Sequence, residues 1–202
     1  MTKHEIKYIQ DRMAVLEGQQ LIRVVRCGSM ATFCFGPMIE TMGYKRNAQK
    51  QLERDEEGNF KKVPILAPKH ALHVECNFRV SCDSHVILAK GDLYELKDEL
   101  ANDPNFEPDE FDYDIVGNNR FEDLAKKYFS DEGMEFFVEQ ISVNKLGDLE
   151  IALTHDFVLE IRIDISGSEE CWRFFDEDVE NSPDLKHLVV LGNGIEEEVP
   201  NP

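Results

Sequence analysis

Hydrophobic residues recur with two different periods along this chain. Near the N-terminus, Ile6, Ile9, Met13 and Leu16 follow one another at intervals of three or four residues. This spacing places their side chains on one face of a helix, and a glycine shortly afterwards is a common stop signal. The pattern predicts an amphipathic helix over residues 4–17.

The remainder of the first half is rich in β-branched and aromatic residues, arranged in short runs between glycines, prolines and polar clusters. Such runs are typical of strands. A last, less apolar run fits a short helix. The predicted strands are residues 21–27, 30–35, 71–80 and 85–89, and the predicted short helix is residues 93–100.

The second half begins with another helical spacing, at Phe121, Leu124 and Tyr128, and continues as strand-like runs. An acidic tail, residues 196–198, follows the last of these runs. The predicted strands are residues 135–143, 148–153, 157–165, 171–175 and 187–191.

Two segments interrupt these patterns. Residues 38–69 are polar and contain two prolines, which predicts an exposed insertion, either a long loop or an extended hairpin. Residues 102–118 form an acidic connector with Asp-Pro and Glu-Pro breaks. The chain is therefore divided into an N-terminal unit, 1–101, the connector, and a C-terminal unit, 119–202.

The two units share a short pattern. Phe78-Arg79 precedes a His-led apolar run ending near glycine, and Trp172-Arg173 precedes a second such run. If the match is a true repeat rather than chance, the fold class is α+β: two similar units in tandem, each a helix with an antiparallel sheet, related by a pseudo-twofold axis.

Charge is divided unevenly between the two halves. Residues 1–90 carry 14 basic and 10 acidic residues, whereas residues 91–202 carry 8 basic and 31 acidic residues, which gives the total of −19. An acidic surface repels nucleic acid and anionic membranes and attracts basic proteins. We therefore expect a basic protein partner, with no nucleic acid and no membrane; the oligomeric state stays open.

Two further features of the sequence bear on the cellular compartment of the protein. The sequence has neither an apolar signal-like segment at its start nor a run long enough to cross a bilayer. Its five cysteines are odd in number and widely spaced, which favours reduced thiols over a disulfide framework. The expectation is a cytoplasmic protein.

Motifs of enzymes and metal sites are weak. No nucleophile turn, phosphate-binding glycine loop or zinc-protease helix occurs, and the cysteine and histidine spacing does not fit a structural zinc site. We expect no catalytic residue, metal or cofactor. On a strand, neighbouring side chains point to opposite faces, so Trp172 should fill the core while Arg173 faces an acidic neighbour. The alternative is a ligand cleft built from Arg79, Trp172 and Arg173.

The connector is the better candidate site, because aromatic residues alternate there with carboxylates. Buried aromatic anchors inside a charged rim are typical of protein interfaces. The predicted partner-binding residues are Glu107, Asp109, Glu110, Phe111, Asp112, Tyr113 and Asp114.

About the last 60 residues also show a resemblance. The pattern from Gly147-Asp148-Leu149-Glu150-Ile151 through Trp172-Arg173-Phe174-Phe175 to His187-Leu188-Val189-Val190 resembles small uncharacterised bacterial proteins. Some of these lie near polymorphic toxins and are regarded as immunity proteins. The resemblance implies a binding protein rather than an enzyme, and it implies no catalytic residues.

The leading hypothesis is therefore an acidic protein that neutralises a basic partner, such as a bacterial toxin, by covering it. A second hypothesis is a DNA mimic whose carboxylates imitate phosphates. A third, of a different class, is a small-molecule binder or an enzyme with a cleft between the two halves.

Overall fold

Strands dominate the structure. The computed structural model describes residues 1–47, 49, 51–107, 111–130, 134–176 and 187–198. Within these residues all eleven strands pair antiparallel in one sheet. They are β1 Gln20–Cys27, β2 Met30–Tyr44, β3 Lys62–Val74, β4 Asn77–Cys82, β5 His85–Ala89, β6 Phe136–Val143, β7 Leu149–Leu153, β8 Phe157–Arg162, β9 Glu170–Asp176, β10 His187–Leu191 and β11 Gly194–Glu198.

Helices are fewer and short, and most were predicted. In the described chain they are α1 Lys3–Met13, α2 Asp98–Ala101 and α3 Arg120–Phe129, with 3-10 turns η1 Ala14–Leu16 and η2 Lys90–Tyr94. A capping box starts α1: the Thr2 hydroxyl accepts from the Glu5 amide and the Glu5 carboxylate accepts from the Thr2 amide. This fixes the helix that the N-terminal spacing predicts.

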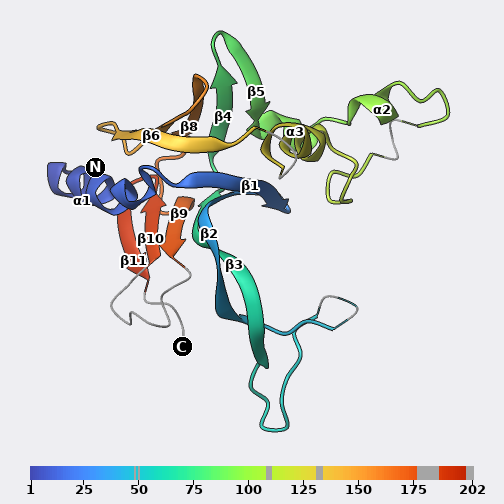
Figure 1. Ribbon diagram of the computed structural model, residues 1–202, viewed down its shortest axis with the longest axis horizontal. Coiled ribbons are helices and arrows are strands. Elements are labelled where there is room, and N and C mark those ends of the chain that lie inside the picture. The colour runs from blue at the N-terminus through green and yellow to red at the C-terminus, as the bar shows by residue number, and fades with distance from the viewer. Residues whose placement is uncertain (48, 50, 108–110, 131–133, 177–186, 199–202) are drawn as a thin grey trace.

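The order of strands mixes the two halves of the chain. It runs β11-β10-β9-β3-β2-β1-β6-β7-β8-β4-β5, so β1 pairs with β6, β3 with β9 and β4 with β8. In each of these pairs one strand precedes the acidic connector and the other follows it. Figure 1 shows β1 passing between the β9–β11 group and the β4–β8 group.

The core is likewise shared. One cluster of buried side chains contains Leu16 and Phe33 from the first half together with Phe121, Leu159 and Trp172 from the second. The predicted mixture of helices and antiparallel strands is confirmed. The tandem, twofold-related units are not confirmed, because the strands of the two halves alternate within one sheet.

Of the two alternatives predicted for residues 38–69, the extended hairpin is confirmed, because β2 and β3 pair as far as Tyr44 and Lys62. Figure 1 shows this hairpin projecting from the rest of the chain. Two other local predictions need correction. Glu196, in the predicted tail, belongs to β11, because its backbone pairs with Val189. The helix predicted over 93–100 is divided into η2 and α2.

Within the described residues, no helix combines the length and the apolar character that crossing a membrane requires.

Candidate functional site

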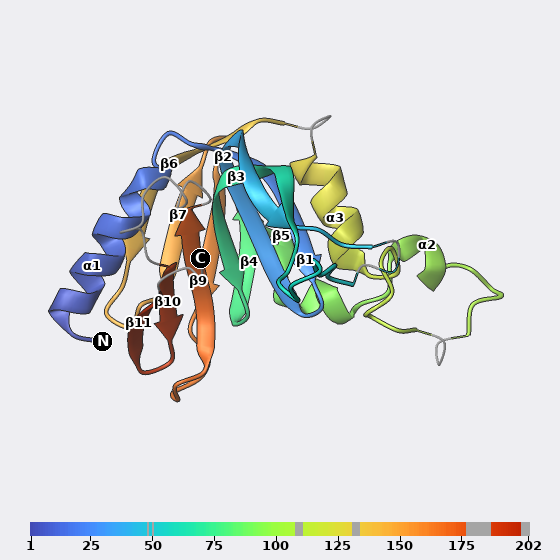
Figure 2. The same ribbon diagram turned by 90° about the horizontal axis from the view of Figure 1, so that it is seen from below.

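A segment between β5 and α3 leaves the body of the protein. We call residues 90–119 the acidic lobe; they carry ten acidic and two basic residues. Figure 2 shows α2 and its flanking loops extending beyond α3, on the side opposite α1. The lobe therefore presents negative charge at one extremity of the molecule.

The base of the lobe is held by Arg120, the first residue of α3. Its guanidinium lies 2.6 Å from the Asp98 carboxylate and 3.4 Å from that of Asp92. Its backbone amide donates to the Glu95 carbonyl at 2.8 Å. Leu93 is fully buried beneath these contacts. The start of α2 is thus fixed to α3 rather than hanging from a free linker.

A second attachment comes from β1. The Arg26 guanidinium donates to the Glu122 carboxylate at 3.0 Å and to the Ile115 carbonyl at 3.3 Å, and only 4% of the Arg26 side chain is exposed. Glu122 also accepts from the Gly117 amide. These bonds join the end of the lobe, α3 and the sheet.

Apolar side chains are exposed on this acidic lobe. The rings of Tyr94 and Tyr113 meet edge to face with centroids 5.2 Å apart, and each is more than a third exposed. Ile115 is 50% exposed and Val116 is 76% exposed. Large apolar groups surrounded by carboxylates and left in water are a feature of interaction surfaces.

Most of the predicted interface residues that the structure describes are exposed. Glu107, Asp112 and Asp114 are exposed, and Phe111 is half-buried. Two further predicted residues, Asp109 and Glu110, lie outside the described residues. Sequence reasoning missed Tyr94, Ile115 and Val116, although the apolar pair Ile115-Val116 directly before a glycine in an acidic segment is a usable signal.

The alternative cleft is not assembled as the sequence suggested. Arg79 on β4 lines a hollow with Val86 and Arg162, whereas Arg173 on β9 lines another with His73 and His187. Trp172 is fully buried, as expected for a core residue, and its indole Nε1 finds no acceptor among the described residues. Arg79 and Arg173 therefore line different hollows, and Trp172 lies in the core.

Both arginines hold carboxylates. Arg173 binds Glu170 through two nitrogens, at 2.7 and 3.2 Å, as expected. Arg79 and Arg162 both donate to Glu160, whose side chain is 9% exposed. The hydrogen bond from Arg79, with support from Arg162, lowers the pKa of Glu160 below its usual value. These contacts stabilise the sheet and leave little free positive charge for a ligand.

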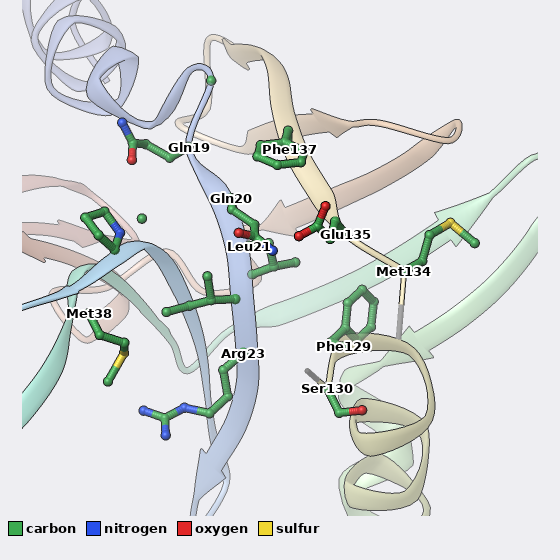
Figure 3. Close-up of a pocket in the computed structure, with 14 residues that line it drawn as sticks. Gln19, Gln20, Leu21, Arg23, Met38, Phe129, Ser130, Met134, Glu135 and Phe137 are labelled. Carbon is green, nitrogen blue, oxygen red and sulfur yellow. The ribbon is translucent and has the colours of Figure 1, made fainter. Parts of the chain in front are cut away.

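A separate hollow of about 710 Å³ lies at the start of β1. Figure 3 shows Arg23 and Met38 on one side of the strand and Phe129 and Ser130 on the other, where α3 ends. Polar and apolar side chains share its lining. Among the described residues, no two side chains of this lining form a hydrogen bond or an ion pair with each other.

Metal and thiol chemistry receive no support from the described residues. No group of three or more potential ligands among them comes close enough to hold a metal ion. Cys76 and Cys171 are buried neighbours, and burial raises the pKa of both thiols, that of Cys171 to about 11. Such thiols are mostly protonated near neutral pH and are weak nucleophiles.

Comparison with protein-family models, with curated proteins and with solved structures found no match to this chain. Functional inference therefore depends on the site itself.

Proposed function

We propose that this protein binds a basic protein partner through the acidic lobe and inhibits the partner by covering its surface. The observation that carries the proposal is the exposed set of Tyr94, Tyr113, Ile115 and Val116 within a segment of net charge −8. Apolar groups supply buried contact area, and the surrounding carboxylates select a basic surface.

The two kinds of side chain have different effects on binding. Exposed carboxylates such as Asp112 and Asp114 act over several ångströms, so they speed the encounter with a basic protein. The tyrosine pair acts only at contact, so it slows dissociation. Because α3 and β1 hold the base of the lobe, this base requires little ordering when the partner binds.

In its most specific form, the proposal is an immunity protein that neutralises a bacterial toxin in the cytoplasm. The excess of acid in the second half and the resemblance noted above favour this form. A nuclease toxin has a basic substrate-binding surface, which an acidic lobe complements.

The partner is first sought by tagged capture from lysate of the native host at low and at high salt. We expect one stoichiometric basic protein whose capture weakens as salt rises, because salt screens exposed charges. Capture of no basic protein at low salt contradicts the proposal.

Charge reversal then locates the interface. Replacing Glu99, Glu107, Asp112 and Asp114 by Lys should lower the association rate constant with the captured partner at least tenfold at low salt. The matched control, with Glu56, Glu57, Glu139 and Glu150 replaced by Lys, changes net charge equally at exposed positions outside the lobe. Equal slowing in both variants would show that net charge alone acts and that the lobe is not the interface.

A further inference from the structure

One strand inside the sheet has an edge that is mostly unpaired. Along one side, β1 pairs with β2 from Leu21 to Cys27. Along the other it pairs with β6 only at Gln20 and Leu21, because β6 begins at Phe136, the partner of Leu21. From residue 22 to residue 27 this second edge has no backbone partner among the described residues. An open edge of this kind is a template for another strand.

The hairpin register shows which groups the edge presents. Cys27 pairs with Met30 across the two-residue turn at Gly28, whose φ is +58°. In such a hairpin the closing pair is hydrogen-bonded and the pairs then alternate. Val24 and Arg26 consequently direct their N–H and C=O groups away from β2. Both donors and acceptors are available to an added strand.

A groove runs along this edge. The hollow at the start of β1 and a second one of about 600 Å³ beside α3 share Ile22, Arg23, Phe129 and Ser130, so they adjoin. Its walls are β1 and the C-terminal half of α3, with Met134 and Phe137 beyond them (Figure 3).

Apolar side chains stand exposed along the groove. They are Val25, Met38, Met134 and Phe137, each between 38% and 53% exposed. Side chains of an extended peptide alternate between two faces. Every second residue of a docked strand can therefore meet this apolar lining.

Positive charge also collects here, in a protein of net charge −19. The Arg23 guanidinium and the Lys126 ammonium are exposed, and neither has an ion pair within the described chain. By contrast, Arg26 in the same groove is tied to Glu122. Together the two hollows are lined by four basic and three acidic residues, so the lining carries a net charge of +1.

We propose that this groove binds an extended acidic segment of a partner protein, which adds to β1 as a further strand. The backbone edge supplies the hydrogen bonds, Arg23 and Lys126 select acidic side chains, and the exposed apolar groups contact the residues between them. This site goes beyond the proposed function, because its ligand has the opposite charge from the partner of the acidic lobe.

The probe is a fluorescein-labelled peptide, acetylated and amidated, of sequence Glu-Val-Glu-Val-Glu-Val-Glu, with binding followed by fluorescence anisotropy. We expect saturable binding and, on the labelled protein, slower hydrogen exchange of the Val24 and Arg26 amides. The double variant Arg23→Glu, Lys126→Glu should bind at least tenfold more weakly. The matched control Lys3→Glu, Lys145→Glu, with equal charge change outside the groove, should bind as the parent does.

Backbone pairing is tested separately from charge. Two further peptides carry N-methyl groups on alternate amides, in opposite phase. Because only one edge of the peptide faces β1, one phase should abolish binding and the other should retain it. Equal binding of both methylated peptides, absence of saturable binding up to millimolar concentration, or dimerisation through β1 with the peptide excluded would each overturn the proposal.

Discussion

At the scale of single residues, Glu160 is a buried carboxylate shared by two arginines. The residue lies on β8, opposite Arg79 of β4, and also accepts from Arg162 on its own strand. Both guanidinium groups remain partly exposed, whereas the carboxylate does not. The contact between Arg79 and the buried Glu160 carboxylate therefore helps to hold β4 and β8 in register.

Glu160→Gln should lower the free energy of unfolding by about 1–2 kcal/mol, since the two guanidinium groups then donate to a neutral amide oxygen instead of a carboxylate. The pKa of Glu160 is lowered on folding, so its contribution is present above the ordinary value of 4.5 and is lost as pH falls through the folded value. Urea unfolding at pH 7 and pH 3 should show the difference between variant and parent shrinking at the lower pH. A difference independent of pH would contradict this assignment.

Thiol reactivity should separate the cysteines by burial. Cys27 is exposed at the end of β1, whereas Cys34, Cys76 and Cys171 are buried. A thiol-reactive chromophore should modify Cys27 within minutes in native protein and the buried three only after denaturant is added, because reaction needs an accessible thiolate. Cys27→Ser removes the fast phase. Rapid modification of the buried thiols in native protein would contradict the packing described here.

Predictions about single residues were confirmed where they depended only on the alternation of side chains along one strand. Alternation alone placed Trp172 in the core and Arg173 on the other face, beside Glu170. The partners of Arg79 were not predictable, because Glu160 is 81 residues away and reaches it only through β4–β8 pairing. The pattern along one strand predicts which face of the sheet a side chain occupies. The residue that it contacts depends on which strands are neighbours in the sheet.

At the scale of elements, α3 is attached to the sheet by the pair Arg26–Glu122. The Arg26 guanidinium is nearly buried, and it reaches the lobe as well as the helix. Asn119 caps the same helix by accepting from the Glu122 amide. One residue, Glu122, thus connects the cap, the lobe and β1.

A double-mutant cycle on Arg26→Met and Glu122→Gln should show a coupling free energy of about 1–3 kcal/mol, as expected for a mostly desolvated ion pair. Each single variant should also increase hydrogen exchange across residues 113–119, because the lobe loses its attachment. Lys7→Met with Asp11→Asn, an exposed pair on α1, is the control and should couple by less than about 0.5 kcal/mol. Additive effects at Arg26 and Glu122 would contradict the attachment.

The hairpin formed by β2 and β3 should tolerate shortening. Its outer part exposes Met42, Tyr44 and Leu66 and contributes nothing to the buried cluster. Replacing residues 45–61 by Asn-Gly should leave the melting temperature within about 3 °C, since an exposed irregular segment adds little stability. A fall of more than about 10 °C, measured by calorimetry, would show that the hairpin has a structural role.

The sequence predicted the type of most elements but not all their boundaries. Helices α1 and α3 follow directly from the spacing of apolar residues. The length of β2 was missed because none of its outer residues, from Pro37 to Tyr44, is buried, so no buried face marks them. β11 was missed because its glutamates suggest a solvated tail, whereas an edge strand pairs by its backbone.

At the scale of the whole molecule, the halves of the chain depend on each other. Three of the strand pairs, β1–β6, β3–β9 and β4–β8, join residues from either side of the acidic connector. Residues 1–101 or 119–202 expressed alone should therefore lack cooperative unfolding, and mixing the two fragments should restore it. Cooperative unfolding of either fragment by itself, followed by Trp172 fluorescence or far-ultraviolet circular dichroism, would contradict this dependence.

The candidate site was predictable only in outline. Acidic composition identified the connector, and the structure adds that Tyr94 and Tyr113 meet although they are 19 residues apart. The open edge of β1 could not be foreseen, because it depends on where β6 begins and not on any property of residues 22–27 themselves. The charge of a segment can be counted from its own residues, whereas an unpaired strand edge is a property of the completed sheet.

The interleaved strand order also affects how the protein is made. Val74 of β3 pairs with Trp172 of β9, so 98 positions separate the partners. A ribosome needs about 5–20 s to add that many residues at ordinary elongation rates. Throughout this interval the nascent chain holds a finished β2–β3 hairpin whose apolar edge awaits a strand that has not been synthesised. An unpaired strand edge of this kind is prone to pair with other chains, so we expect association during synthesis to be a hazard that the finished protein no longer has.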